Sequence, residues 1–300
     1  MRERRRKGQG SGYIGVLFLF LVGVTVFFCV QGLYGPWRAK DRSEAGVTPG
    51  AVQGDGTEAT LTPGTGQEDI VVSDKETPTM SDAEETVAAF AQNHNLNLNE
   101  WPEEMIELMK ANPEAAEFVL NYPLKKNEIF SINLSEYRGC NKVPLLMQWD
   151  ERWGYSKYGD NVMGLTGCGP TCLSMVCIYL LEDTKYDPLY MAKFAEENGY
   201  YVSGSGSAWT LISKGGKKLG LDVIEIPLDE NRIRRNLEVG NPIICIMGPG
   251  DFTTTGHFIV MTEYVDGKIR INDPNSRERS EMLWDYEDIK GQIKNLWVCR

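Results

Sequence analysis

The chain divides into three stretches by the pattern of its hydrophobic and polar residues. Residues 13–30 contain no charged side chain and are rich in Leu, Val and Phe. Residues 38–89 contain no aromatic side chain, and residues 41–80 are mostly Gly, Thr, Pro, Ala, Glu and Asp. Such a composition cannot bury enough apolar surface to fold. The periodic apolar patterns of helices and strands begin only at Ser81.

Three short helices are predicted in residues 81–139. Ser81-Asp82-Ala83-Glu84 is a capping box and predicts the start of the first helix. Trp101-Pro102-Glu103-Glu104 predicts the second, with proline at its first position. Asn112-Pro113-Glu114 predicts the third, which is expected to stop before Pro123. Helices this short are expected to brace the next domain rather than to fold alone.

From about Val143 to Arg300 the pattern predicts an α+β domain. A strongly apolar helix is expected after Pro170, and its nearly all-round apolarity marks it as buried. Another helix is expected from near Ser207 to Gly220. Asp266-Gly267 is a strong hairpin signal between two of the expected strands. The strands are expected at Ile243 to Met247, Phe258 to Tyr264 and Lys268 to Asn272.

The formal charge of −11 is unevenly distributed. Five basic residues and one acidic residue lie in the first twelve positions. The remainder holds 26 basic and 41 acidic residues, which gives it a charge of −15. It therefore lacks the basic face that phosphates require, and nucleic acid is not an expected partner. The oligomeric state is not indicated.

The uncharged run of 18 residues is at the lower edge of what spans a membrane as a helix. Because the basic cluster precedes it, the N-terminus should stay in the cytoplasm and the remainder should be exported. A cleaved signal peptide is the alternative, but no small-x-small cleavage pattern follows the run. The predicted organisation is a cytoplasmic basic tail (1–12), a transmembrane anchor (13–31), a disordered acidic stalk (32–80), a short helical segment (81–139) and a catalytic domain (140–300).

Cys168 lies in Gly167-Cys168-Gly169-Pro170-Thr171-Cys172, where a loop is expected to enter the buried helix. Pro170 suits the first helical turn, so Cys168 is expected at the helix N-terminus, where the macrodipole favours an anion. That setting lowers a thiol pKa from about 8.5 to roughly 3.5–7.5 and produces a nucleophilic thiolate. A buried structural cysteine is the alternative, and it is the better interpretation for Cys172 and Cys177.

A thiolate nucleophile needs an imidazole beside it and a third group to orient the ring. Of the two histidines, His94 ends the first predicted helix, whereas His257 opens an apolar strand in the domain that holds Cys168. Hairpin pairing about Asp266-Gly267 would bring Asp273 back near His257. The alternatives are a structural strand histidine and an ordinary turn aspartate before proline.

Gln148 lies twenty residues before Cys168, in Gln148-Trp149-Asp150. Its side-chain amide could join the Cys168 backbone N–H in an oxyanion hole, although alone it would be an ordinary polar residue.

These motifs together resemble the C39-type cysteine peptidases, and more closely their stand-alone C39-like relatives. The resemblance covers roughly residues 143–300. It rests on the order of Gln-Trp-Asp, Gly-Cys-Gly-Pro-Thr, Gly-His-Phe and Asn-Asp-Pro-Asn around Gln148, Cys168, His257 and Asp273. It implies a papain-like fold with Cys168 as nucleophile, His257 as general base and acid, Asp273 as orienting residue and Gln148 in the oxyanion hole.

The resemblance implies hydrolysis of a peptide or protein without a cofactor, and the expected outward orientation makes the cell envelope a source of substrates. The best-known members are fused to transporters and trim double-glycine leaders in the cytoplasm. This sequence has no transporter segment and is expected to face outward, so leader trimming is not carried over. The alternatives are a papain-like acyl transferase and a non-catalytic peptide-binding module. A structural zinc site is not expected, because Cys168 and Cys172 lack a second ligand pair.

Two further features are left open by the sequence. Cys140 and Cys299 bracket the domain and could form a disulfide, but pairing cannot be deduced from sequence. Residues 203–209, rich in Gly and Ser with Trp209 at the end, either rim the substrate cleft or cap the next helix.

Overall fold

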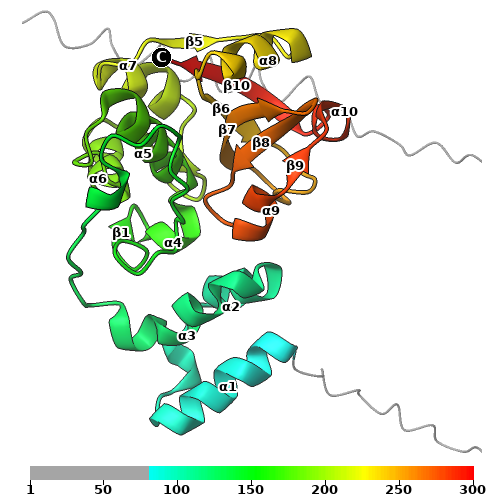
Figure 1. Ribbon diagram of the computed structural model, residues 1–300. Coiled ribbons are helices and arrows are strands. Elements are labelled where there is room, and N and C mark those ends of the chain that lie inside the picture. The colour runs from blue at the N-terminus through cyan, green and yellow to red at the C-terminus, as the bar shows by residue number, and fades with distance from the viewer. Residues whose placement is uncertain (1–80) are drawn as a thin grey trace, which may run out of the picture. The chain divides into compact units, whose positions relative to one another are not determined.

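The computed structural model describes residues 81–300, which belong to one compact unit (Figure 1). The predicted tail, anchor and stalk lie outside the described residues. No helix in the described part of the chain is long and apolar enough to span a membrane.

A six-stranded antiparallel sheet organises the domain. Its strand order is β5-β10-β6-β7-β8-β9, and two-stranded pairs β1-β2 and β3-β4 lie outside it. The strands are β1 Lys157–Tyr158, β2 Asn161–Val162, β3 Tyr201–Val202, β4 Gly206–Ser207, β5 Val223–Glu225, β6 Ile243–Met247, β7 His257–Val265, β8 Lys268–Asn272, β9 Leu283–Trp284 and β10 Ile293–Cys299. The α+β class predicted from the sequence is confirmed.

Both faces of the sheet are covered by helices, so its central strand β6 is apolar at every position. In β6, Ile244 and Ile246 join the core around α5, whereas Ile243 and Cys245 join the core under α8 and α10. This alternation follows from the two-residue period of a strand. The α-helices are α1 Asp82–His94, α2 Glu103–Ala111, α3 Ala116–Lys125, α4 Met163–Thr166, α5 Cys168–Leu181, α6 Pro188–Glu197, α7 Gly216–Lys218, α8 Glu230–Glu238, α9 Arg277–Glu281 and α10 Tyr286–Ile289.

The first helix begins as predicted. The Ser81 hydroxyl accepts from the backbone N–H of Glu84, and the Glu84 carboxylate accepts from the backbone N–H of Ser81 at 2.8 Å. Short 3-10 turns (η1 Leu98–Glu100, η2 Pro113–Ala115, η3 Ser135–Tyr137) join or follow the helices of this segment. Pro102 immediately precedes α2.

The predicted stop of the third helix before Pro123 is wrong, because α3 continues through this residue to Lys125. Proline cannot donate to the carbonyl of Val119, four residues earlier. The indole Nε1 of Trp101 donates to that oxygen instead, at 2.8 Å. A tertiary hydrogen bond therefore replaces the missing helical one.

The helical segment packs directly on the domain. Phe118 stacks on the ring of Tyr155 with centroids 4.5 Å apart, and the Tyr155 hydroxyl donates to the Phe118 carbonyl. A Cβ at Gly154 would lie 2.8 Å from the Phe118 ring, and a Cβ at Gly164 would overlap it. Only glycine at these two positions lets the ring approach so closely.

The hairpin β7–β8 forms where predicted. Asp266 and Gly267 have φ angles of 51° and 83°, as a type I′ turn requires. The pairing shifts by one residue between Met261 and Glu263, so that Asn272 lies opposite Val260. Such a bulge bends the strand and re-aims the residues beyond it.

The helix expected from Ser207 to Gly220 begins later. Gly206–Ser207 is strand β4, and the helical turns are a π-type turn, η4 Leu211–Gly215, followed by α7. Ser207 pairs with Tyr201 across β3–β4, which removes it from the helix.

Candidate active site

Cys168 is the first residue of α5, a helix of 14 residues whose interior is buried. The N–H groups of a first helical turn have no intrahelical partner. The half-buried Cys168 thiol lies at this end of the helix, where the backbone N–H groups of Gly169 and of Phe258, on β7, lower its pKa. This arrangement stabilises a negative charge on sulfur.

His257, the first residue of β7, lies within hydrogen-bonding reach of the Cys168 thiol. Its Nε2 is 2.7 Å from Oδ1 of Asp273, and this leaves Nδ1 as the ring nitrogen for the thiol. His257 is 7% exposed and Asp273 is fully buried, so solvent screens their interaction little. The structure thus brings together three of the four residues singled out in the sequence.

The three groups shift one another's pKa. For Cys168, burial opposes ionisation, but the hydrogen bond and charge of His257, with the N–H donors of Phe258 and Gly169, lower the pKa below 9.0. For His257, burial opposes protonation, but the charge and hydrogen bond of Asp273 and then those of Cys168 raise the pKa to about 10. Both shifts favour a thiolate beside an imidazolium at neutral pH.

Asp273 has a second partner that the sequence reasoning missed. Nε of Arg279, on α9, donates to Oδ2 of Asp273 at 2.6 Å. Burial alone would raise the pKa of Asp273, but the charges and hydrogen bonds of His257 and then Arg279 lower it. The carboxylate is therefore held ionised from both sides.

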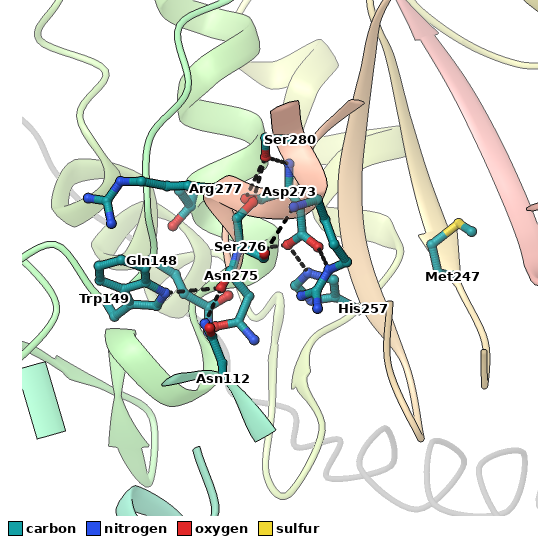
Figure 2. A network of polar contacts seen from close by, with 12 residues as sticks. Asn112, Gln148, Trp149, Met247, His257, Asp273, Asn275, Ser276, Arg277 and Ser280 are labelled. Atoms are coloured by element: carbon teal, nitrogen blue, oxygen red, sulfur yellow. Dashed lines mark hydrogen bonds and ion pairs between the residues drawn. The ribbon is translucent and has the colours of Figure 1, made fainter. Parts of the chain in front are cut away.

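The turn that follows β8 fixes the Asp273 side chain and backbone (Figure 2). Oδ1 of Asp273 also accepts from the N–H of Asn275 at 2.7 Å, and the backbone N–H of Asp273 donates to the Ser280 hydroxyl at 2.9 Å. Ser276 pairs with Asp273 in an isolated bridge and caps α9. The local sequence signal that could have indicated α9, and with it Arg279, is Ser276, which lies three residues before Arg279 and fits a helix N-cap.

Gln148 is buried beside this turn, and its hydrogen bonds go to residues other than Cys168. Its backbone N–H donates to the carbonyl of Pro274 at 2.7 Å, and its Nε2 donates to the carbonyl of Gly164 at 2.9 Å. Because Gly164 offers an acceptor, the nitrogen must face it. Nε2 keeps a second N–H, and Oε1 is buried without a partner in the described part of the chain.

The remaining cysteines of residues 81–300 differ from Cys168. Cys172 and Cys177 are fully buried in α5, and burial raises the pKa of both. Cys140 and Cys299 are free thiols rather than a disulfide. The other histidine, His94, is exposed at the end of α1 and stacks on Phe90.

The loop of residues 203–209 lies against the start of α5. A Cβ at Gly169 would lie 2.7 Å from the Ser207 hydroxyl, which is itself 2.7 Å from the hydroxyl of Tyr158. Trp209, at the end of the loop, is 46% exposed. The loop therefore borders the residue next to Cys168 and carries an accessible aromatic ring.

We expect the pH profile of thiol alkylation to reveal the ion pair. In the full chain, iodoacetamide should alkylate Cys168 with a midpoint below pH 9.0, because its pKa is lowered. His257→Ala removes the neighbouring charge and should raise that midpoint. Once that midpoint lies above pH 7, each further pH unit of rise reduces the rate at pH 7 about tenfold. Peptide mass spectrometry measures the rate at each cysteine, and an unchanged midpoint in His257→Ala would contradict the pairing.

This arrangement can perform acyl chemistry. A thiolate at a helix N-terminus is a nucleophile, the adjacent imidazolium is a proton donor, and the buried carboxylate keeps the ring oriented. Free backbone N–H groups at the same helix end can stabilise an oxyanion.

Comparison with protein families gives a match over the domain that holds these residues. A model of the Peptidase_C39 like family matches residues 140–299. No curated protein matches the chain.

The solved structures that are similar to it include the following two. One is the peptidase domain of Streptococcus ComA, a bi-functional ABC transporter involved in a quorum-sensing pathway, with 19% identity, a TM-score of 0.36, and coverage of 52% of this chain and 96% of that one. The other is a C39-like peptidase from Bacillus anthracis, with 17% identity, a TM-score of 0.33, and coverage of 53% of this chain and 94% of that one.

Proposed function

Because the chain belongs to the peptidase C39-like family, we propose that it is a cysteine peptidase acting through Cys168, His257 and Asp273. The observation that carries this proposal is that the buried Asp273 carboxylate lies 2.7 Å from Nε2 of His257, while His257 in turn lowers the pKa of the half-buried Cys168 thiol. A non-catalytic module would gain nothing from a thiol pKa lowered in this way.

The first step forms a thioester. The Cys168 thiolate attacks the amide carbonyl carbon, and a carbon–sulfur bond forms as the carbonyl electrons move onto oxygen. When the tetrahedral intermediate collapses, the carbon–nitrogen bond breaks. The His257 imidazolium gives its proton to the leaving amine. Asp273 keeps the ring oriented throughout.

The developing oxyanion needs hydrogen-bond donors. We assign this role to the backbone N–H of Cys168 and the second side-chain N–H of Gln148, whose first N–H is held by Gly164. The bond to the Gly164 carbonyl fixes the amide before substrate arrives, and donors fixed in advance need no reorganisation during the reaction.

Water completes the cycle. Neutral His257 takes a proton from water as the oxygen attacks the thioester carbonyl, and the carbon–sulfur bond then breaks. The products are a carboxylic acid and the restored thiolate–imidazolium pair.

A peptide-library cleavage screen with the purified full chain tests this function. We expect new N-termini to appear with the native chain and not with Cys168→Ala. Adding primary amines separates hydrolysis from acyl transfer, because a transferase would incorporate the amine at the new C-terminus. Absence of any cleavage or transfer by a chain whose Cys168 is alkylated below pH 7 would contradict the proposal.

We further propose that the peptidase is anchored in the membrane with residues 81–300 on the outer side. The support is the basic cluster that precedes the uncharged run of residues 13–30. Peptides or proteins of the cell envelope are then the substrates within reach.

Protease treatment of intact cells that express the chain checks this orientation. Residues 81–300 should be removed and an N-terminal tag should be spared, because only the outer part is accessible. In detergent-permeabilised cells the tag should be lost as well. Protection of residues 81–300 in intact cells would rule out the outward orientation.

A further inference from the structure

The turn that carries Asp273 and Arg279 is held by a residue from outside the region that the family model matches. Glu114 lies in η2, between α2 and α3. Its Oε1 accepts from the Ser276 hydroxyl at 2.6 Å, and its Oε2 accepts from the backbone N–H of Arg277 at 2.9 Å. The N–H of Glu278 is a third donor, at 3.3 Å.

These donors are the first groups of α9. A helix of five residues makes few internal hydrogen bonds and is not stable alone. A carboxylate on its unpaired N–H groups supplies the missing partners. Glu114 is therefore a cap that reaches α9 from 162 residues earlier in the sequence.

A second contact from the same segment reaches the same turn. The side-chain amide of Asn112 donates to the Asn275 carbonyl, which also accepts from Nε1 of Trp149 at 3.2 Å. Arg277 lies over the Trp149 ring, 4.4 Å from its centroid. Figure 2 shows Asn112 and Trp149 on one side of Asn275 and His257 on the other side of Asp273.

The contacts continue from this cap to the nucleophile. Ser276, the N-cap of α9, accepts from the N–H of Arg279, and Arg279 donates to Asp273. Asp273 in turn holds His257, which adjoins Cys168. A series of hydrogen bonds thus links Glu114 to His257, whose charge lowers the pKa of the Cys168 thiol.

We propose that Glu114 is a positioning residue of the active site, through which the helical segment of residues 82–125 holds α9 and keeps Asp273 and Arg279 in place. This inference rests on the proposed function, because it concerns the same thiolate and imidazolium. The helical segment is then part of the catalytic unit, although the family model matches only residues 140–299.

The direction in which the pKa of Cys168 moves distinguishes a positioning role of Glu114 from a purely electrostatic effect of its charge. Removing a negative charge near a thiol favours the thiolate and lowers its pKa. Loosening Asp273 does the opposite, because the imidazolium loses its partner and then stabilises the thiolate less. Glu114→Gln should therefore raise the alkylation midpoint of Cys168 if Glu114 positions Asp273.

Iodoacetamide alkylation of Cys168 in the full chain, measured from pH 5 to 10, is the test. We expect Glu114→Gln to raise the midpoint by roughly one pH unit, and therefore to reduce the rate about tenfold at pH values well below the midpoint of the parent. Asp273→Asn should shift it in the same direction. The matched control is Glu117→Gln, which loses the same charge at an exposed position of α3 without a hydrogen bond to the turn.

A conservative variant and a measurement of thermal unfolding distinguish loss of positioning from loss of the folded state. Glu114→Asp retains the charge with a shorter reach and should lie between the parent and Glu114→Gln. Thermal unfolding of each variant identifies any that is unfolded. In the double variant Glu114→Gln, Asp273→Asn the two shifts should not add, because both residues act through His257.

Two outcomes would overturn the inference in distinguishable ways. If Glu114→Gln and Glu117→Gln give the same profile, Glu114 does not position the site, and the proposed peptidase function stands. If Cys168 of the parent is not alkylated ahead of the other cysteines below pH 7, the proposed function fails and the inference fails with it.

Discussion

Replacing Cys168 with alanine is expected to reduce the rate of amide hydrolysis by a factor of at least about 10⁴. The thiolate is the nucleophile of the proposed mechanism, and its lowered pKa depends on the groups around this one sulfur. His257→Ala should have nearly the same effect. Base and nucleophile act as one unit, so their losses do not add. Initial rates on a peptide identified by the library screen measure the effect.

Cys172→Ala is the matched control for this experiment. Cys172 lies one turn further along α5, is fully buried, and has a pKa that burial raises well above 9.0. Its loss should change the stability of the core and leave the rate per folded molecule close to that of the parent. Full activity in Cys168→Ala, or loss of activity in Cys172→Ala with the fold intact, would remove the proposed mechanism.

Gln148→Ala is expected to reduce kcat by about 10²–10³ with little change in KM, as loss of an oxyanion donor does elsewhere. The backbone should stay in place, because the N–H of Gln148 is held by the Pro274 carbonyl independently of the side chain. The substitution also leaves the Gly164 carbonyl without its donor. That loss should cost about 1–3 kcal/mol of unfolding free energy.

Alkylation separates this role from a structural one. The reaction of a thiolate with iodoacetamide develops no oxyanion, so Gln148→Ala should keep the alkylation profile of Cys168 while losing turnover. A parallel fall in both rates would mean that Gln148 supports the thiolate instead. Retention of full turnover would show that other donors stabilise the oxyanion.

Several local features could be predicted from short stretches of sequence. The capping box at Ser81, the hairpin at Asp266-Gly267 and the buried helix that begins at Cys168 all depend on residues within a few positions of one another. Each is encoded by turn chemistry, capping or hydrophobic period, and each is found in the structure. Local signals also placed Cys168 at a helix N-terminus, His257 at the start of a strand and Asp273 where the paired strand ends.

Other features depended on contacts that no local pattern carries. The helix α3 runs through Pro123 because the indole of Trp101 satisfies the carbonyl of Val119. The bulge in β7 sets which residue of β8 lies opposite Val260. Strand β10, in the interior of the sheet, went unpredicted because Lys294 and Asn295 interrupt it after its first residue, which leaves neither a regular alternation nor a long apolar run.

The sequence by itself determined the chemical types and their order: a thiol, an imidazole, a carboxylate and an amide on elements with recognisable ends. Only the tertiary structure decided what surrounds Asp273. Arg279 reaches it across a turn, and Glu114 reaches that turn from 162 residues away. Helix capping and hydrophobic periodicity depend on residues a few positions apart in the sequence. The ion pair and hydrogen bonds around Asp273 depend instead on which residues lie close together in space, and only the packing of the core decides that.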